Sequence, residues 1–169
     1  MSKIELIIAN NYEEMSQKAA DIIIELIKKK PNAVLGLATG STPLGLYKIL
    51  ISKYKERLIS FKDVLTYNLD EYCDIPKEHE QSYFTYMNKN LFDHIDINKN
   101  NTHLPEGEGD SKLNSENYEK ELNEIKIDIQ LLGVGSNGHI GFNEPGTDIN
   151  LGVHEVVLIN KIIIIQKRF

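Results

Sequence analysis

Short apolar runs alternate with longer amphipathic segments along most of this chain. Four apolar runs have the length and composition of β-strands: residues 3–9, 32–40, 63–69 and 126–135. The last three of these runs lead into loops. Helical spacing of apolar positions occurs between and around them, at residues 10–30, 42–58, 82–95 and 115–125. Strands that alternate with helices of this length form parallel sheets covered by helices. We therefore predict an α/β fold with an open, mostly parallel sheet and helices on both faces.

The ends of the first two predicted helices carry local signals. Asn11 is suited to cap the first helix, acidic residues follow it, lysines occupy the last turn, and Pro31 ends the segment. Pro43 falls in the first turn of the second helix, where its missing N–H group costs nothing. No internal repeat or linker divides the 169 residues, so we expect a single domain.

Charge and cysteine content exclude several classes of protein. The net charge is −6 and the only arginines are Arg57 and Arg168, which gives a nucleic-acid partner little support. Cys73 is the single cysteine, so an internal disulfide is excluded and a reduced, cytoplasmic location is expected. The N-terminus lacks a signal-peptide pattern, and no stretch approaches the roughly 18 apolar residues of a membrane span. We expect a soluble protein without a membrane partner.

Unusual chemistry is concentrated in three loops that follow predicted strands, where ligands of open α/β sheets bind. In the first loop the chain turns at Gly40, and Ser41 and Thr42 precede a helix. Free N–H groups and the positive end of the helix dipole would converge there, which favours an anion such as phosphate. The lysine of a nucleotide-binding P-loop is absent, and an ordinary capped turn is the alternative.

The second loop places two adjacent carboxylates, Asp70 and Glu71, directly after a buried strand. Neighbouring side chains on an extended chain point in opposite directions, so the two are expected to do different jobs. One would face the cleft as a base or ligand, and the other would pair with the scaffold. The alternative is that both are solvated loop residues.

The third loop, residues 131–147, contains the spacing G-x-G-x-x-G, which invites a dinucleotide-binding interpretation. That motif requires its third glycine, here Gly138, to lead into a helix. Gly141 and Pro145 follow too closely for a helix of any length to form. We therefore reject a dinucleotide site.

The same loop presents Asn137, His139 and Glu144. A histidine near a carboxylate is suited to acid–base chemistry close to neutral pH. The alternative is that His139 caps a turn and Glu144 lies on the surface. A metal site formed by Asp70, His139 and Glu144 is not predicted, because the sequence lacks the H-x-H or H-x-x-x-H spacing.

Together these loops resemble the glucosamine-6-phosphate deaminase family, also called glucosamine-6-phosphate isomerases. The resemblance rests on GLATGSTPLGLYK, YNLDEY and LLGVGSNGHIGFNEPGT, and it covers nearly the whole chain. The related 6-phosphogluconolactonases share the glycine loop but typically lack the N-E-P sequence. The resemblance implies a Rossmann-like fold and the conversion of glucosamine 6-phosphate to fructose 6-phosphate and ammonia, without an organic cofactor or a metal.

The resemblance also implies roles for individual residues. Asp70 would be the base for enolisation. His139 would assist opening of the pyranose ring, with Asn137 and Glu144 as its partners. The phosphate would be held by residues from distant parts of the chain: Gly40, Ser41, Thr42 and Arg168.

Two departures from the family pattern modify these expectations. Asn137 stands where some members have Asp, so it would orient His139 without a charge and tune ring opening differently. The chain ends at Phe169, whereas the family continues with a segment that supplies further strands, helices and a phosphate-binding lysine. The sheet is therefore expected to be incomplete at its C-terminal side, with residues 145–169 forming a lid region. Residues of an allosteric activator site are not recognisable.

Three functions stay open at this stage. The first is a deaminase that acts on a hexosamine 6-phosphate. The second is a sugar-phosphate-binding module or fragment without catalysis. The third is a 6-phosphogluconolactonase-like hydrolase, against which the N-E-P and DEY sequences argue. The expected partner is the small-molecule substrate, and assembly into a homo-oligomer is an open alternative.

Overall fold

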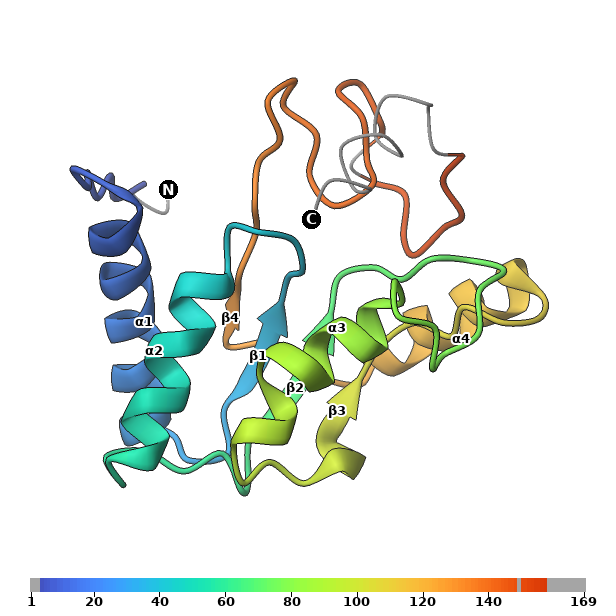
Figure 1. Ribbon diagram of the computed structural model, residues 1–169. Helices are drawn as coiled ribbons and strands as arrows, with labels where there is room; N and C mark the ends of the chain where they lie inside the picture. Colours follow the sequence, from blue (N-terminus) through green and yellow to red (C-terminus); the bar gives the residue numbers. More distant parts are fainter. Residues whose placement is uncertain (1–3, 149, 158–169) are drawn as a thin grey trace.

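A four-stranded parallel sheet forms the centre of the computed structural model, which describes residues 4–148 and 150–157 (Figure 1). The strands lie in the order β3-β2-β1-β4 and are β1 (Val34–Leu37), β2 (Leu65–Asn68), β3 (Thr102–His103) and β4 (Ile129–Gln130). All three strand pairs are parallel, with Leu37 beside Asn68 at the carboxyl end of the central pair. The predicted parallel sheet is confirmed.

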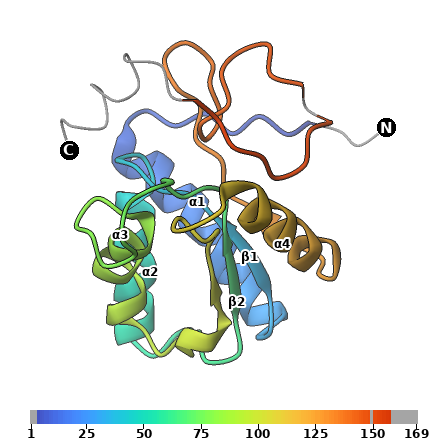
Figure 2. The same cartoon turned by 90° about the vertical axis from the view of Figure 1, so that its right-hand side faces the viewer.

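Helices cover both faces of this sheet. They are α1 (Tyr12–Lys29), α2 (Leu44–Lys55), α3 (Tyr83–Asn90) and α4 (Ser111–Asn123), with short 3-10 helices at Phe92–His94 and Lys99–Asn101. Figure 2 shows α2 and α3 on one side of β1 and β2, and α4 on the other side. In the described part of the chain, no helix is both long and apolar enough to cross a membrane.

The core lies between the sheet and the helices α1, α2 and α3. Its members are large apolar side chains that are almost fully buried, among them Ile23, Ile27, Leu35, Leu37, Tyr47, Leu50, Val64, Met87 and Leu91. Burial of each such side chain contributes about 1.5–3 kcal/mol. The strands are thereby fixed, and so are the points at which the loops leave them.

The helix ends follow the local signals in most cases. The Asn11 side chain accepts the N–H of Glu14 at 2.8 Å, and α1 ends at Lys29, two residues before Pro31. Pro43 is the N-cap of α2 rather than a residue of its first turn, although its backbone is already helical. These boundaries are set by short-range hydrogen bonding, which explains why the sequence predicts them closely.

Two features of the middle of the chain were not predicted. Helix α4 begins at Ser111, four residues before the predicted start at Ser115, because Asp110 accepts the N–H groups of Lys112 and Leu113 and caps the helix. Strand β3 has only two residues, which is too short to leave a recognisable apolar pattern.

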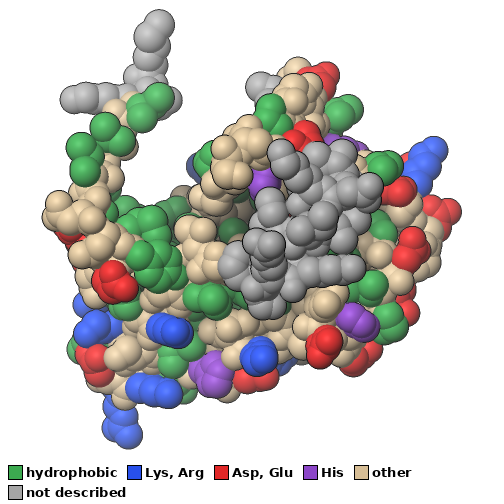
Figure 3. All heavy atoms as spheres, turned by 45° about the horizontal axis from the view of Figure 1, so that its top comes forward, with side chains coloured by type: hydrophobic (Ala, Val, Ile, Leu, Met, Phe, Trp, Pro, Cys, Tyr) green, Lys and Arg blue, Asp and Glu red, His purple; other side chains and the backbone are tan. Residues whose placement is uncertain are grey.

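The predicted strand at residues 3–9 is wrong for its described part, residues 4–9, which contain no strand. Ile4 is 92% exposed and Leu6 is 81% exposed, although both are strongly apolar. Figure 3 shows hydrophobic side chains of this segment at the left, standing clear of the rest of the surface. An apolar run becomes a strand only where a neighbouring edge supplies hydrogen-bond partners, and no described strand pairs with this segment.

Candidate functional site

The carboxyl ends of the strands share one edge of the sheet, and the strand order reverses there. β1 is followed in sequence by β2 on one side, whereas β4 lies against its other side. Ligands of open α/β sheets bind at such a switch point. One loop leaves this edge after each of the four described strands. Three of them hold the candidate residues, and we call these the β1 loop (residues 38–43), the β2 loop (69–82) and the β4 loop (131–148).

A cleft of about 780 Å³ opens at this edge, between the β2 loop, α4, residues 138–148 and residues 151–156. Asp70 and Glu144 line it, from opposite loops. Asn137 and His139 do not, and neither do the predicted phosphate ligands of the β1 loop, among the described residues. The structure thus brings one predicted base and one predicted partner into a single cleft, and the other candidates among the described residues lie outside its lining.

The two adjacent carboxylates have different surroundings, in agreement with the expectation from sequence. Glu71 accepts the backbone N–H groups of Tyr72 and Tyr83 at 2.8 Å and that of Phe84 at 2.9 Å. The latter two belong to the first turn of α3, whose N–H groups have no partner within the helix. Both carboxylates line the cleft, but that of Glu71 pairs with the scaffold. Asp70 is therefore the carboxylate that is left to act in the cleft.

The carboxyl group of Asp70 is enclosed, although the residue as a whole is only half-buried. The backbone of Gly141 in the β4 loop packs directly on it, since a Cβ atom at Gly141 would lie 2.9 Å from Asp70 Oδ2. Burial, and secondly the negative charge of Glu71, raise the pKa of Asp70 to about 7. A carboxyl group with a pKa near neutrality can both accept and return a proton at physiological pH.

Asn137, His139 and Glu144 form one hydrogen-bonded chain within the β4 loop. The ring Nδ1 of His139 lies 2.6 Å from Asn137 Oδ1, and Asn137 Nδ2 donates to Glu144 Oε2 at 2.7 Å. The other carboxylate oxygen of Glu144 is buried and has no hydrogen-bond partner among the described residues. The structure therefore brings together three residues that the sequence singled out separately.

This chain of bonds assigns the protonation of the imidazole. An amide oxygen can only accept, so the proton between the two groups belongs to Nδ1 of His139. In the neutral ring, Nε2 then keeps its lone pair and can accept a proton. The backbone N–H of His139 also donates to Asn137 Oδ1 at 3.2 Å, so Asn137 holds both the ring and its backbone.

Two glycines of the β4 loop allow its backbone to pass close to the side chains of His139 and Asp70. Any Cβ atom at Gly135 would overlap the ring of His139. Gly141 has φ +58, and a Cβ atom there would lie 2.8 Å from Leu69 as well as against Asp70. Glycine is thus required at these positions because the backbone passes against catalytic candidates.

Three aromatic rings connect the β4 loop to the β2 loop and to α3. Phe142 stacks on Tyr83 at 5.6 Å between ring centroids and contacts Tyr72 at 5.1 Å. Tyr83 also hydrogen-bonds Thr39 of the β1 loop, and the nearby Asp70 carboxylate adds to the effect of burial in raising the pKa of Tyr83. Tyr83 therefore lies between the cleft and the β1 loop.

The β1 loop is held in place by tyrosine hydroxyls. Gly40 has φ +92, a conformation that favours glycine, and its carbonyl oxygen accepts a hydrogen bond from Tyr86 of α3. Tyr12 donates to the carbonyl oxygens of Ser41 and Thr42, each at 3.1 Å. The hydroxyls of Ser41 and Thr42 have no hydrogen bond within the described residues, so they are available to a ligand.

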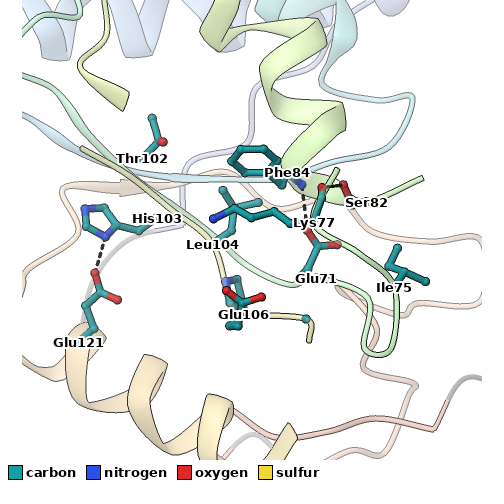
Figure 4. A pocket seen from close by; sticks show the side chains of 12 residues that line it. Glu71, Ile75, Lys77, Ser82, Phe84, Thr102, His103, Leu104, Glu106 and Glu121 are labelled. Carbon is teal, nitrogen blue, oxygen red and sulfur yellow. Dashed lines mark hydrogen bonds and ion pairs between the residues drawn. The ribbon is translucent and has the colours of Figure 1, made fainter. Parts of the chain in front are cut away.

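A second, smaller pocket of about 150 Å³ lies behind the β2 loop (Figure 4). Glu71 and Glu106 line both pockets, while His103 and Glu121 form an ion pair on the far wall of the smaller one. Because the Glu71 carboxylate is already committed to backbone N–H groups, this pocket adds no further acid–base group next to Asp70.

Part of the predicted lid region forms the outer wall of the cleft. Val153 donates its N–H to Glu119 of α4 at 2.6 Å, and Ser111 of α4 donates to Glu155 at 2.6 Å. Arg168, the predicted phosphate-binding arginine, lies outside the described residues, as do all residues from 158 onward. Within the described part, no group of three His, Cys, Asp or Glu side chains is arranged for a metal ion.

The fold and this loop arrangement define the class of protein. The family described as glucosamine-6-phosphate isomerases and 6-phosphogluconolactonases matches residues 9–156. The chain belongs to this family.

Individual relatives give a more specific comparison than the family as a whole. The chain is 52% identical over 167 residues to a glucosamine-6-phosphate deaminase of Thermoanaerobacter sp. (strain X514), covering 98% of this chain and 66% of the relative. It is 51% identical over 166 residues to a glucosamine-6-phosphate deaminase of Mycoplasma mycoides, covering 98% and 67%. The chain thus spans about two thirds of the length of the curated relatives that it matches.

Solved structures support the same fold. A monomeric glucosamine-6-phosphate deaminase superposes with a TM-score of 0.91 at 43% identity, covering 94% of this chain and 67% of that chain. A 6-phosphogluconolactonase from Thermotoga maritima superposes with a TM-score of 0.69 at 24% identity, covering 87% and 67%. The latter likeness concerns the fold alone.

Several residues of this site were not predicted from sequence. The aromatic contacts of Phe142 and the tyrosine contacts to the β1 loop join residues far apart in the chain, and no local pattern signals them. The one available hint is that tyrosine is frequent, with eight in the chain, while tryptophan is absent. Buried tyrosine hydroxyls require partners, which in this protein are mostly loop carbonyls.

Proposed function

We propose that this chain takes part in the conversion of glucosamine 6-phosphate and water to fructose 6-phosphate and ammonia. The observation that carries the proposal is the Asp70 carboxyl group, enclosed at the carboxyl end of β2, raised in pKa to about 7, and packed against the loop that holds His139. Membership of the family supports the same reaction, and so do the glucosamine-6-phosphate deaminases that are about 50% identical in sequence to this chain.

The first step is opening of the pyranose ring. The neutral imidazole of His139 accepts the proton of the C1 hydroxyl at Nε2, the bond between C1 and the ring oxygen breaks, and the imidazolium returns that proton to the ring oxygen. Asn137 holds the imidazole in the tautomer that this step requires. Glu144 in turn holds Asn137. The product is an open-chain aldehyde, whose carbonyl acidifies the proton on C2.

The second step is proton transfer between carbons. The Asp70 carboxylate removes the C2 proton while the C1 oxygen gains a proton, which gives an enolamine. Asp70 then returns its proton to C1 as the amino nitrogen loses one, so that a C1 hydroxyl and an imine at C2 are left. Water adds to the imine carbon, and ammonia leaves to give the ketone of fructose 6-phosphate. A positioned acid–base group of this kind typically contributes about 10²–10⁴-fold to the rate.

The phosphate is assigned to the β1 loop, with Gly40, Ser41 and Thr42 as ligands and Arg168 as a further cation. Support comes from the unpaired hydroxyls of Ser41 and Thr42 at the start of α2, where the helix dipole favours an anion. Phosphate binding at a distance from the reacting carbons supplies binding energy that orients them.

The test is an assay of the 169-residue chain with glucosamine 6-phosphate, in which ammonia and fructose 6-phosphate are measured together. We expect Asp70→Asn and His139→Gln each to lower kcat by about 10²–10⁴-fold while the chain stays folded. Asp74→Asn is the matched control: it lies in the same loop at φ +63, which asparagine tolerates, and activity should be unchanged.

Two outcomes would contradict the proposal. A folded chain that binds glucosamine 6-phosphate equally well with Asp70 or Asn at this position, and releases no ammonia, would be a binding module. Hydrolysis of 6-phosphogluconolactone without ammonia release from the amino sugar would instead assign the lactonase reaction.

A further inference from the structure

Three tyrosines from three helices donate hydrogen bonds to four carbonyl oxygens of the β1 loop. Tyr47 of α2 donates to the carbonyl oxygen of Ala38, and Tyr86 of α3 donates to that of Gly40. Tyr12 of α1 donates to the carbonyl oxygens of Ser41 and Thr42. We call Tyr12, Tyr47 and Tyr86 the tyrosine clamp. Tyr47 is fully buried, whereas Tyr12 is 42% exposed, so the clamp runs from the core to the surface.

The clamp fixes the direction of the amide groups as well as the carbonyls. A peptide unit is planar and trans, so its N–H points opposite to its C=O. Holding the carbonyls of residues 38, 40 and 41 therefore directs the N–H groups of Thr39, Ser41 and Thr42 away from the tyrosines. Within the described residues, none of these three N–H groups donates a hydrogen bond. They are free to bind an anion together.

Tyr12 also takes over the capping of α2. The N-cap residue Pro43 has no side-chain hydrogen bond, and the N–H of Gly45 donates to the Tyr12 hydroxyl at 2.8 Å. A Cβ atom at Gly45 would lie 3.0 Å from the Tyr12 ring and would overlap Ser16 of α1. Glycine at this position lets α1 approach closely enough for Tyr12 to reach the loop.

We propose that the tyrosine clamp positions the β1 loop for the phosphate of the substrate and sets the affinity for that group, without taking part in the proton transfers. The inference rests on the proposed function in assigning the phosphate to this loop. The tyrosines are positioning residues, because their hydroxyls contact carbonyl groups on the side of the loop opposite to the free N–H groups.

The test uses Tyr12→Phe and Tyr86→Phe, each of which removes one hydroxyl and leaves the ring. The probes are inorganic phosphate, whose Kd is measured by titration calorimetry, and glucosamine 6-phosphate, for which KM and kcat are measured. Each variant should weaken phosphate binding and raise KM by about three- to tenfold, with kcat within about twofold. Tyr12→Phe should have the larger effect, because the Tyr12 hydroxyl contacts Ser41, Thr42 and Gly45, whereas that of Tyr86 contacts Gly40 alone. The double variant should lose more than either single one.

Tyr54→Phe is the matched control. Tyr54 lies at the far end of α2, packs against the core, and makes no hydroxyl hydrogen bond within the described residues. It should leave the phosphate Kd, KM and kcat unchanged. Thermal unfolding of all variants separates a general loss of structure from a loss of phosphate affinity.

The proposed role of the tyrosine clamp is overturned if Tyr12→Phe and Tyr86→Phe lower the unfolding temperature but leave the phosphate Kd unchanged. It is equally overturned if these variants lower kcat rather than raise KM. It is also overturned if the folded wild-type chain does not bind phosphate. If phosphate binding depends on the clamp but no ammonia is released, the clamp stands and the proposed reaction fails.

Discussion

The β1 loop and the β4 loop both leave the carboxyl edge of the same sheet, yet they are built in different ways. The β1 loop is short, begins at the buried Ala38, and is held by hydroxyls from three helices. The β4 loop is longer, is held mainly by hydrogen bonds within itself, and contacts the β2 loop through Gly141 and α3 through Phe142.

This difference indicates a division of labour. A loop with its backbone fixed from outside suits a constant group such as phosphate, which is bound but not changed. A loop whose side chains hold one another suits proton transfer, where the geometry among His139, Asn137 and Glu144 matters most. Changes in the β4 loop should therefore alter kcat, and changes in the β1 loop should alter KM.

Among substitutions that keep the proposed proton-transfer groups, the largest expected effect comes from Gly141→Ala. The new methyl group would press on Asp70 and Leu69 and separate the β4 loop from the β2 loop, so we expect kcat to fall about 10–100-fold. Gly146→Ala is the control, because its φ of +95 imposes similar backbone strain but nothing lies within 4 Å. Equal losses of activity in the two variants would show that strain, rather than contact with Asp70, is responsible.

Asp70→Asn should make the folded chain more stable at high pH. The folded pKa of Asp70, about 7, lies above its ordinary value of 3.8, so the folded state holds its proton more tightly than the unfolded state. Stability is therefore lost as pH rises towards 7, and asparagine removes this loss. Between about pH 5 and pH 8 the advantage of the variant in urea unfolding should grow by on the order of 2 kcal/mol. If the difference in unfolding free energy between the variant and the wild-type chain did not change with pH, the Asp70 carboxyl group would not be enclosed in the folded state.

Asn137→Asp tests the balance of charge within the β4 loop. A carboxylate at 2.6 Å from the His139 ring favours its protonated form and removes the N–H now donated to Glu144. Because the proposed base is a neutral imidazole, we expect the acidic limb of the pH–rate profile to move to higher pH by about one unit. An unchanged profile would mean that Asn137 acts by orientation alone.

The smallest effect is expected from Ser41→Ala in the β1 loop. Its hydroxyl has no partner within the described residues, so removal should cost little stability, and the backbone N–H groups stay in place. KM for glucosamine 6-phosphate should rise about threefold with kcat unchanged. A fall in kcat larger than the rise in KM would remove the proposed division between the loops.

The clearest contrast between sequence and structure involves two apolar runs. Residues 34–37 and residues 4–8 have similar composition, but only the first run forms a strand, with β2 on one side and β4 on the other. Apolar composition favours a strand, whereas pairing decides whether one forms. The wrong prediction for the N-terminal run therefore reflects its surroundings and not its residues.

The sequence by itself determined the parallel α/β architecture, the first helix with its cap at Asn11, and the three loops that hold the candidate residues. These features depend on periodicity and on contacts within a few residues. Only tertiary packing settles that Glu71, although it lines the cleft together with Asp70, binds the start of α3 and leaves Asp70 to act there. It also decided that Tyr12 reaches the β1 loop, 29 residues further along the chain. Such contacts depend on how the helices pack around the sheet, and packing joins residues that no local pattern relates.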